Sequence, residues 1–165
     1  MIITPSMLKH HAQCPFSFKL KYIDGLVPTV KKSSEVLGNY LHLTIQKFLK
    51  NEIQNPEGYF VSLWDEVKEF LVYPEGEDGE KLKEIALKIL GQIPEFVKTL
   101  GEIVEVEQPY EADLPVGLLR GTPDLIVVQN GGVVLDWKIT RSVIEGKERI
   151  DPQLRMYGYL TGVPR

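Results

Sequence analysis

Two acidic residues and a lysine lie close together in the second half of the sequence, in Gly121-Thr122-Pro123-Asp124 and in Asp136-Trp137-Lys138. Residues two apart on a β-strand point to the same face, so this spacing puts Asp136 and Lys138 on one face and Trp137 on the other. Two carboxylates and an ammonium group in one patch suit a hard divalent cation, which prefers oxygen ligands and also binds phosphate. Taken alone, Asp-x-Lys more often marks an exposed ion pair on a solvated strand.

The turn between these segments decides whether Asp124 joins the patch. A three-residue loop at 130–132 would pair 124 with 138 and leave all three charged side chains on one face, whereas a loop of two or four residues would turn Asp124 away. Gly132 suits the left-handed last residue of a three-residue loop. The sequence therefore favours the register in which the charges converge.

Two pairs of residues four apart could bring further polar groups to the patch. Gln153 and Tyr157 have this spacing on a predicted closing helix and share one of its faces. Gly38 and His42 have it on an earlier predicted helix, where the glycine would let another backbone come close. Singly, His42 is typical of a surface or core histidine and Tyr157 of a core residue, so the pairs gain meaning only as a set.

The predicted helices that frame these residues come first in the chain. Thr4-Pro5 begins a short helix that stops near Cys14-Pro15, because the residue before a proline disfavours helix. The apolar residues from Phe16 to Tyr22 then recur with a period of two, which favours an extended segment over a second short helix. Apolar spacing and breaker residues predict three longer helices, at 36–49, 57–72 and 79–100, the last ended or kinked by Pro94.

After Gly101 the pattern changes to strands, predicted at 102–113, 118–128 and 133–139 as an antiparallel meander. Asp151-Pro152 then provides an N-cap and a first-turn proline for the closing helix, which runs through about residue 160. Because no linker divides the chain, we expect a single domain over 1–165, with a mainly helical part at 1–100 and the sheet and closing helix at 101–165.

Composition narrows the class of protein. The chain has 165 residues, 43% of them hydrophobic, one cysteine and a net charge of −4. One cysteine allows no internal disulfide and no four-cysteine zinc or iron–sulfur site, and no apolar run is long enough to span a membrane, so we expect a cytoplasmic protein. Residues 1–50 carry seven lysines against two acids, a net of +5, and residues 51–107 carry fourteen acids against five bases, a net of −9. Residues 108–165 carry seven of each, so the first and last thirds are the parts able to meet a polyanion, although charge by itself does not decide the function.

In sequence order, the motifs resemble the RecB-type branch of the PD-(D/E)XK nuclease superfamily. They are Gly-x-x-x-His at 38–42, Gly-x-x-Asp at 121–124, Asp-x-Lys at 136–138 and Gln-x-x-x-Tyr at 153–157. The opening segment from Ser6 to Leu26 also looks like that branch, so the resemblance covers nearly the whole chain. It implies an α/β (α+β) fold with a restriction-endonuclease-like core, in which a mixed sheet with an antiparallel meander is flanked by helices.

The resemblance also implies metal ligands and catalytic side chains. Mg²⁺ or Mn²⁺ would be held by carboxylates, an imidazole and a backbone carbonyl, on Asp124, Asp136, Glu107, His42 and Trp137. The catalytic set would be Lys138, Asp136, Asp124, Gln153 and Tyr157. Within it, Lys138 would be the catalytic lysine, and Gln153 with Tyr157 would orient the lysine or touch the substrate. In such enzymes an acidic residue on the first strand often assists, and we assign this role to Glu107 rather than to Glu105 or Glu111.

The chain departs from some members of this branch. The CRISPR-associated adaptation exonucleases and helicase-linked nucleases that carry a 4Fe-4S cluster use one cysteine near the start and three near the end. Here only Cys14 is present, so we expect no iron–sulfur cluster. The sequence also stops eight residues after Tyr157, where many relatives continue, so we expect a minimal or a shortened version of the fold.

The function expected from the resemblance is metal-dependent hydrolysis of DNA phosphodiester bonds. An exonuclease on single-stranded or frayed ends is favoured, in recombination, repair, or phage- or CRISPR-related DNA processing. Its partners would be DNA and a helicase or recombination protein, with no membrane. The alternative is a non-cleaving DNA-binding or scaffold subunit that keeps the nuclease fold. Because every motif residue is intact, the sequence favours the enzyme.

Overall fold

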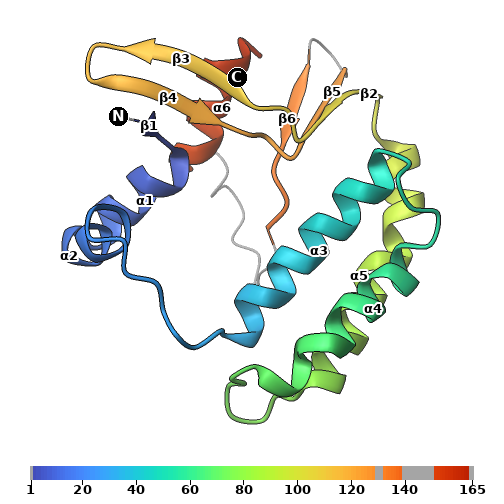
Figure 1. The fold of residues 1–165 in the computed structure, drawn as a ribbon. Coiled ribbons are helices and arrows are strands. Elements are labelled where there is room, and N and C mark those ends of the chain that lie inside the picture. Colours follow the sequence, from blue (N-terminus) through green and yellow to red (C-terminus); the bar gives the residue numbers. More distant parts are fainter. Residues whose placement is uncertain (1, 129–131, 139–150, 164–165) are drawn as a thin grey trace. The chain divides into compact units, whose positions relative to one another are not determined.

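The computed structural model describes residues 2–128, 132–138 and 151–163 (Figure 1). The chain divides into two compact units. The first unit combines residues 1–27 with 101–165, and the second consists of residues 28–100. The first helix of the chain therefore belongs with the strands rather than with the helices that follow it in the sequence.

The first unit begins with a helical hairpin made of α1 (Pro5–Gln13), α2 (Pro15–Phe18) and the π-helical turn η1 (Lys19–Ile23). Thr4 caps α1, because its hydroxyl oxygen accepts a hydrogen bond of 3.2 Å from the Met7 N–H, as the sequence predicts. The extended segment predicted after Pro15 is wrong, and the alternative, a second helix, is right. The rings of Phe18 and Tyr22 contact each other at a tilt of 38°, with centroids 5.1 Å apart, which is a contact between residues four apart on a helix.

Short strands build two small sheets in the first unit. The strands are β1 (Ile2–Ile3), β2 (Glu102–Val106), β3 (Tyr110–Leu114), β4 (Gly117–Gly121), β5 (Leu125–Val128) and β6 (Val133–Leu135). One sheet has the order β1-β4-β3 and the other has the order β2-β5-β6. Because β1 runs parallel to β4 while the other neighbours are antiparallel, the strands are mixed as expected. The single three-stranded meander is wrong, since its first two predicted strands each break into two.

Two local features explain these breaks. Glu107, directly after β2, has a φ of 52°, which lies in the left-handed region and ends an extended run. Pro123 lies between β4 and β5 and has no N–H to donate to a neighbouring strand. The Glu107 N–H donates to the Asp124 carbonyl at 3.1 Å, so the chain is tied together where both breaks occur.

The β5–β6 register differs from the predicted one by two residues. Val127 pairs with Val133 and Leu125 with Leu135, whereas the three-residue loop would have paired 129 with 133. Because side chains alternate with a period of two, a shift of two residues leaves them on the same face. β6 ends at Leu135, so Asp136 and Lys138 follow the strand rather than lie within it. Residues 130 and 131 of the turn and Ile139 lie outside the described residues.

The closing helix α6 (Pro152–Thr161) packs against α1 and against strands of both sheets. Asp151 caps it as predicted, accepting a 2.8 Å hydrogen bond from the Gln153 N–H. Gly121 lies beneath the helix, and a Cβ there would come 2.8 Å from Leu160 Cδ1 and 3.0 Å from Tyr157 Cε1. Only glycine therefore lets α6 lie this close to β4.

The second unit is an all-helical layer of α3 (Ser33–Leu49), α4 (Pro56–Val67) with the 3₁₀ turn η2 (Lys68–Phe70), and α5 (Gly79–Thr99). The three long helices lie side by side (Figure 1). Leu41, Phe60 and Trp64 are fully buried in its core, and the Trp64 indole N–H donates to the Gly79 carbonyl at 2.9 Å. The predicted helices are confirmed within a few residues, except that Pro94 lies inside α5 and does not end it. Among the described helices, none has both the length and the apolar character needed to cross a membrane.

Candidate active site

Asp124 connects the start of β5 to the segment after β6. The residue is 7% exposed, and its Oδ2 accepts a hydrogen bond of 2.5 Å from the Trp137 backbone N–H. A buried carboxylate needs such a donor, because burying an ionised group without one costs far more than the roughly 2–7 kcal/mol for a neutral amide or hydroxyl. The bond also fixes the residues on either side of Trp137, so Asp136 and Lys138 are positioned by Asp124.

Asp136 and Lys138 form an ion pair of unequal exposure. The Asp136 side chain is 4% exposed, whereas that of Lys138 is 46% exposed, and the Lys138 ammonium contacts Asp136 Oδ2. Lys138 Nζ also donates to Gln153 Oε1 at 3.0 Å. The lysine is therefore held at its inner side by a carboxylate and an amide while solvent reaches it.

The Gln153 side chain connects the Asp136–Lys138 ion pair to Tyr157. Its Nε2 donates to Asp136 Oδ1 at 3.0 Å and to the Tyr157 hydroxyl at 2.8 Å, while its Oε1 accepts from Lys138. An amide has one acceptor and two donors, and here each has a partner. The predicted pair on the closing helix thus reaches the Asp-x-Lys motif directly.

Tyr157 lies beneath the polar cluster and is 4% exposed. Burial, which disfavours the charged phenolate, raises the pKa of Tyr157 to about 12, against the opposing effect of the Gln153 hydrogen bond. The negative charges of Asp136, Asp124 and Glu107 raise this pKa further. All three carboxylates therefore lie close enough to act on one phenol.

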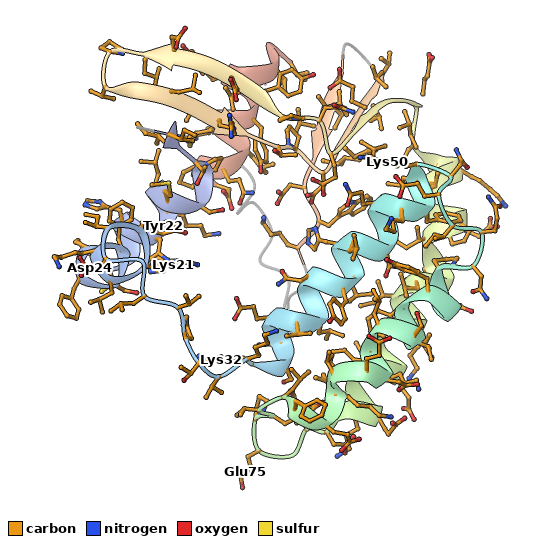
Figure 2. All side chains as sticks on the ribbon, in the orientation of Figure 1. Lys21, Tyr22, Asp24, Lys32, Lys50 and Glu75 are labelled. Carbon is orange, nitrogen blue, oxygen red and sulfur yellow. The ribbon has the colours of Figure 1, made fainter. Side chains whose placement is uncertain are left out.

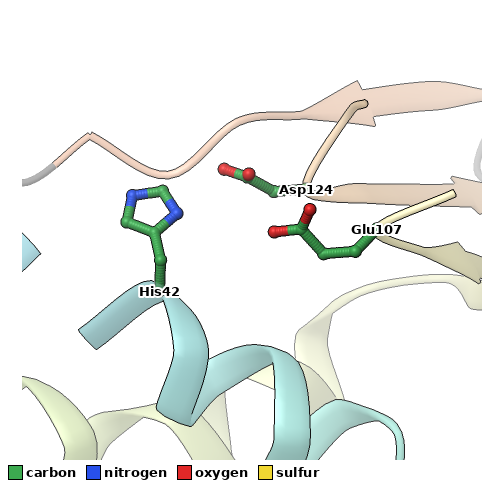
Figure 3. A group of neighbouring side chains, drawn as sticks. All are labelled: His42, Glu107 and Asp124. Atoms are coloured by element: carbon green, nitrogen blue, oxygen red, sulfur yellow. The ribbon is translucent and has the colours of Figure 1, made fainter. Parts of the chain in front are cut away.

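Glu107 and Asp124 bring two carboxylates together within the first unit, in an arrangement that could hold a metal ion. Their carboxylate oxygens approach within 4.8 Å, and both side chains turn to the same side (Figure 3). Two such oxygens fit a hard divalent cation, which would also relieve the repulsion between the two charges. The other first-strand candidates have different partners: Glu105 accepts a hydrogen bond from Tyr110, and Glu111 pairs with Arg120.

His42 lies on α3 in the second unit and is half-buried. At its predicted companion, Gly38, a Cβ would meet no atom of the described residues within 4 Å. The helix face at this position is open among the described residues of its own unit, and the approach of a further backbone to Gly38 stays a prediction. The role of His42 as a ligand remains a prediction.

Two contributions to the site were not evident from side-chain types. The sequence assigns Trp137 a role only through its carbonyl, yet its N–H is what holds Asp124. Gly121 gives the closing helix its close approach to β4, and through it sets the place of Tyr157. The sequence signal for the role of Gly121 is its position three residues before Asp124, in a predicted strand where glycine is otherwise unfavourable.

The geometry agrees with a comparison against known families. No curated protein matches the sequence significantly. The model of the PD-(D/E)XK nuclease superfamily, however, matches residues 2–163, which includes every residue of the cluster described above. Its members are metal-dependent nucleases with a restriction-endonuclease-like fold, and the mixed α/β arrangement of the described residues is consistent with that fold. The chain belongs to the PD-(D/E)XK nuclease superfamily.

Proposed function

We propose that the protein is a Mg²⁺- or Mn²⁺-dependent deoxyribonuclease that removes nucleotides from single-stranded or frayed DNA ends. The observation that supports it best is the continuous set of contacts from Tyr157 through Gln153 to Asp136 and Lys138. A chance Asp-x-Lys motif on a solvated strand would have no reason to bury its aspartate or to share a glutamine with a tyrosine.

In this proposal the metal is held mainly by oxygen atoms. Asp124 and Glu107 supply carboxylates that lie within 4.8 Å of each other, and Asp136 supplies a third. The Trp137 carbonyl and the His42 imidazole complete the proposed ligands. When bound, the divalent cation would supply positive charge that favours ionisation of a water molecule and offsets the charge of the phosphate.

The residues of the chain orient the reacting groups. Lys138 places a positive charge at the solvent-exposed edge of the cluster, where its ammonium group can donate a hydrogen bond to a phosphate oxygen and stabilise the charge that develops on it. Gln153 holds that ammonium group through its Oε1 and Asp136 through its Nε2. The lysine therefore does not need to be ordered when substrate arrives, which lowers the entropic cost of reaching the transition state.

The reaction itself is a substitution at phosphorus. The oxygen of water forms a new bond to phosphorus, the bond from phosphorus to the leaving sugar oxygen breaks, and that oxygen takes up a proton as water gives one up. The products are a free hydroxyl and a phosphate monoester. No residue of the described chain forms a covalent intermediate in this scheme.

The finer features of the proposal rest on the sequence motifs. We propose that the protein belongs to the RecB-type branch and is similar to the CRISPR-associated adaptation exonucleases. We also propose that it acts as an exonuclease with a helicase or recombination partner. We also propose that residues 1–165 act as a single nuclease domain. The family match over residues 2–163 supports this view.

The test is degradation of end-labelled linear DNA, single- and double-stranded, with Mg²⁺, Mn²⁺ or EDTA. Wild-type protein is expected to shorten linear single strands in the presence of metal and to leave circular single strands intact. Lys138→Ala and Asp136→Ala should abolish the reaction. The matched control is Lys83→Ala, which removes a lysine paired with an exposed aspartate, Asp65, on the other unit.

Three outcomes would contradict the proposal. Equal degradation by wild type and both variants would point to a contaminant, and no degradation under any metal would favour the non-cleaving subunit. Cleavage of circles would remove the exonuclease assignment alone.

Calorimetric titration of Mn²⁺ onto wild type and His42→Ala tests the proposed imidazole ligand, and unchanged affinity would remove His42 from the site.

A further inference from the structure

The helical hairpin formed by α1, α2 and η1, which we call the aromatic hairpin (residues 5–23), carries rings that contact one another at its surface. His10 meets Tyr22 edge to face at 5.5 Å between centroids, His11 meets Phe18 at 5.2 Å, and Phe18 lies 5.1 Å from Tyr22. These contacts place the four rings against one another. The hairpin therefore carries a cluster of aromatic side chains.

This surface is left open. Neither α2 nor η1 contains a buried residue, Phe16 is 69% exposed, and Ile23 is equally exposed. Large apolar side chains that are this exposed are candidates for contact with a binding partner. Phe16 matters most here, because its ring has both exposure and the flat shape that a second ring can stack on.

The charge of the hairpin identifies the class of partner. Residues 2–27 contain three lysines, Lys9, Lys19 and Lys21, against one acid, Asp24, a net of +2 in a chain whose total is −4. The Lys21 ammonium lies 5.3 Å from the centroid of the Tyr22 ring, so charge and ring are adjacent (Figure 2). Lysine interleaved with open aromatic rings matches an unpaired nucleic-acid strand, which offers phosphates and free base faces together. In a duplex the base faces are covered by stacking.

The hairpin is also attached to the helix that carries the glutamine and tyrosine of the candidate active site. α1 contacts α6, and Lys9 Nζ lies 4.0 Å from Oδ2 of Asp151, the residue that caps α6. A strand bound to the hairpin would therefore lie on the same compact unit as Asp136 and Lys138.

We propose that the aromatic hairpin is a binding surface for single-stranded DNA, on which a base stacks against Phe16 and Lys21 contacts a phosphate. The identification of the strand as DNA rests on the proposed nuclease function. The surface is separate from the residues proposed for chemistry, so binding and cleavage can be measured independently.

The experiment measures fluorescence anisotropy of a labelled oligothymidylate with the full chain in EDTA, where no metal-dependent cleavage can occur. Phe16→Ala is expected to weaken binding by about 5- to 150-fold, the range for loss of one stacked base. Phe70→Ala is the matched control, because Phe70 is 82% exposed on η2 of the other unit, and it should bind like wild type. Both phenylalanines are exposed, so neither change should lower thermal stability, which is checked by circular dichroism.

A second pair of variants separates charge from stacking. Lys21→Gln should reduce the slope of log binding constant against log salt by about 0.7, as expected for one lost phosphate contact on a single strand. Lys88→Gln, on the exposed face of α5, should leave the slope unchanged. Ultraviolet crosslinking to an oligonucleotide with 5-iododeoxyuridine should label a peptide from the hairpin.

The outcomes distinguish this inference from the proposed nuclease activity. Weaker binding by Phe16→Ala but not by Phe70→Ala supports the surface even when wild-type protein cleaves no DNA. Equal binding by the two variants, stronger binding to blunt duplex than to single strands, or no binding by wild type would overturn the inference even when DNA is cleaved.

Discussion

Each unit contains an aspartate bound to lysine, and the two arrangements differ in burial. In the second unit, Asp65 pairs with Lys68 at 3.0 Å and with Lys83 at 2.9 Å, and its side chain is 40% exposed. In the first unit, the Asp136 side chain is 4% exposed and also receives a hydrogen bond from Gln153. The residue types are the same, so composition alone cannot separate them.

The difference separates a buried ion pair from one at the surface. Water screens the charges around Asp65, and such exposed pairs add little to stability. Around Asp136 the carboxylate is desolvated, a cost that is offset only because lysine and glutamine both contact it. A buried acid with a half-exposed lysine and a shared amide is therefore the feature to test.

The largest expected effect compares Asp124→Asn with Asp65→Asn. The asparagine at 124 keeps an oxygen that can accept the Trp137 N–H but loses its charge, so we expect kcat/KM on DNA to fall by about 10³-fold with little change in folding. Asp65→Asn should leave kcat/KM unchanged. Steady-state degradation of labelled DNA measures both. Similar losses in the two variants would mean that the buried aspartate contributes no more to the reaction than the exposed one.

Next in size is the loss of the shared amide. Gln153→Ala removes the group that holds both Lys138 and Asp136, and positioning residues of this kind typically cost about 10- to 100-fold. The loss should appear in kcat more than in KM, because the lysine is disordered rather than absent. Its counterpart is Glu80→Ala, which removes a partner of Lys68 in the exposed cluster and should not change the rate.

A stability effect follows from the glycine beneath α6. In Gly121→Ala the new methyl group would clash with Leu160 and Tyr157, so we expect a loss of about 1–3 kcal/mol in the free energy of unfolding. Gly38→Ala is the counterpart in the second unit. It places a methyl group in open space on a helix, and should stabilise by about 0.5–1 kcal/mol. Urea unfolding of both variants measures the difference, and a destabilised Gly38→Ala would contradict the open helix face.

The smallest effect is seen only at alkaline pH. Burial raises the pKa of Tyr157 to about 12, so its contribution to stability is full below the ordinary pKa of 10.0 and is lost as the pH rises through about 12. Ultraviolet titration of phenolate should lose one late-ionising group in Tyr157→Phe. Tyr110→Phe should remove another, since the Glu105 hydrogen bond raises the pKa of Tyr110 to about 12. Ionisation of Tyr157 near 10 would mean that the cluster is open to water.

Local signals in the sequence predict the ends of the helices well. Thr4 and Asp151 cap helices through their own side chains, a contact that depends only on residues two or three positions away. The strands are less predictable, because the break at Glu107 is a backbone conformation that no residue type requires. The helical conformation after Pro15 is not predicted, because aromatic residues at even spacings such as Phe18 and Tyr22 fit both a strand with a period of two and contacts four apart on a helix.

The polar cluster could be predicted as a set of residues but not as a geometry. Spacing brings Gln153 and Tyr157 to one face of a helix, and the motif order relates them to Asp136 and Lys138. The hydrogen bond from Trp137 to Asp124 depends on where β6 ends, and the predicted register placed that end differently. A two-residue shift preserved the face, so the convergence survived an incorrect pairing.

Asp151 uses its two carboxylate oxygens for different purposes. Oδ1 accepts the Gln153 N–H that begins α6, whereas Oδ2 faces the Lys9 ammonium of the aromatic hairpin. An amide in place of the carboxylate retains an oxygen for the helix and removes the charge for the lysine. Asp151→Asn thus removes the charged contact between hairpin and helix without unwinding either, and leaves the packing of α1 against α6 as the remaining connection between strand binding and chemistry.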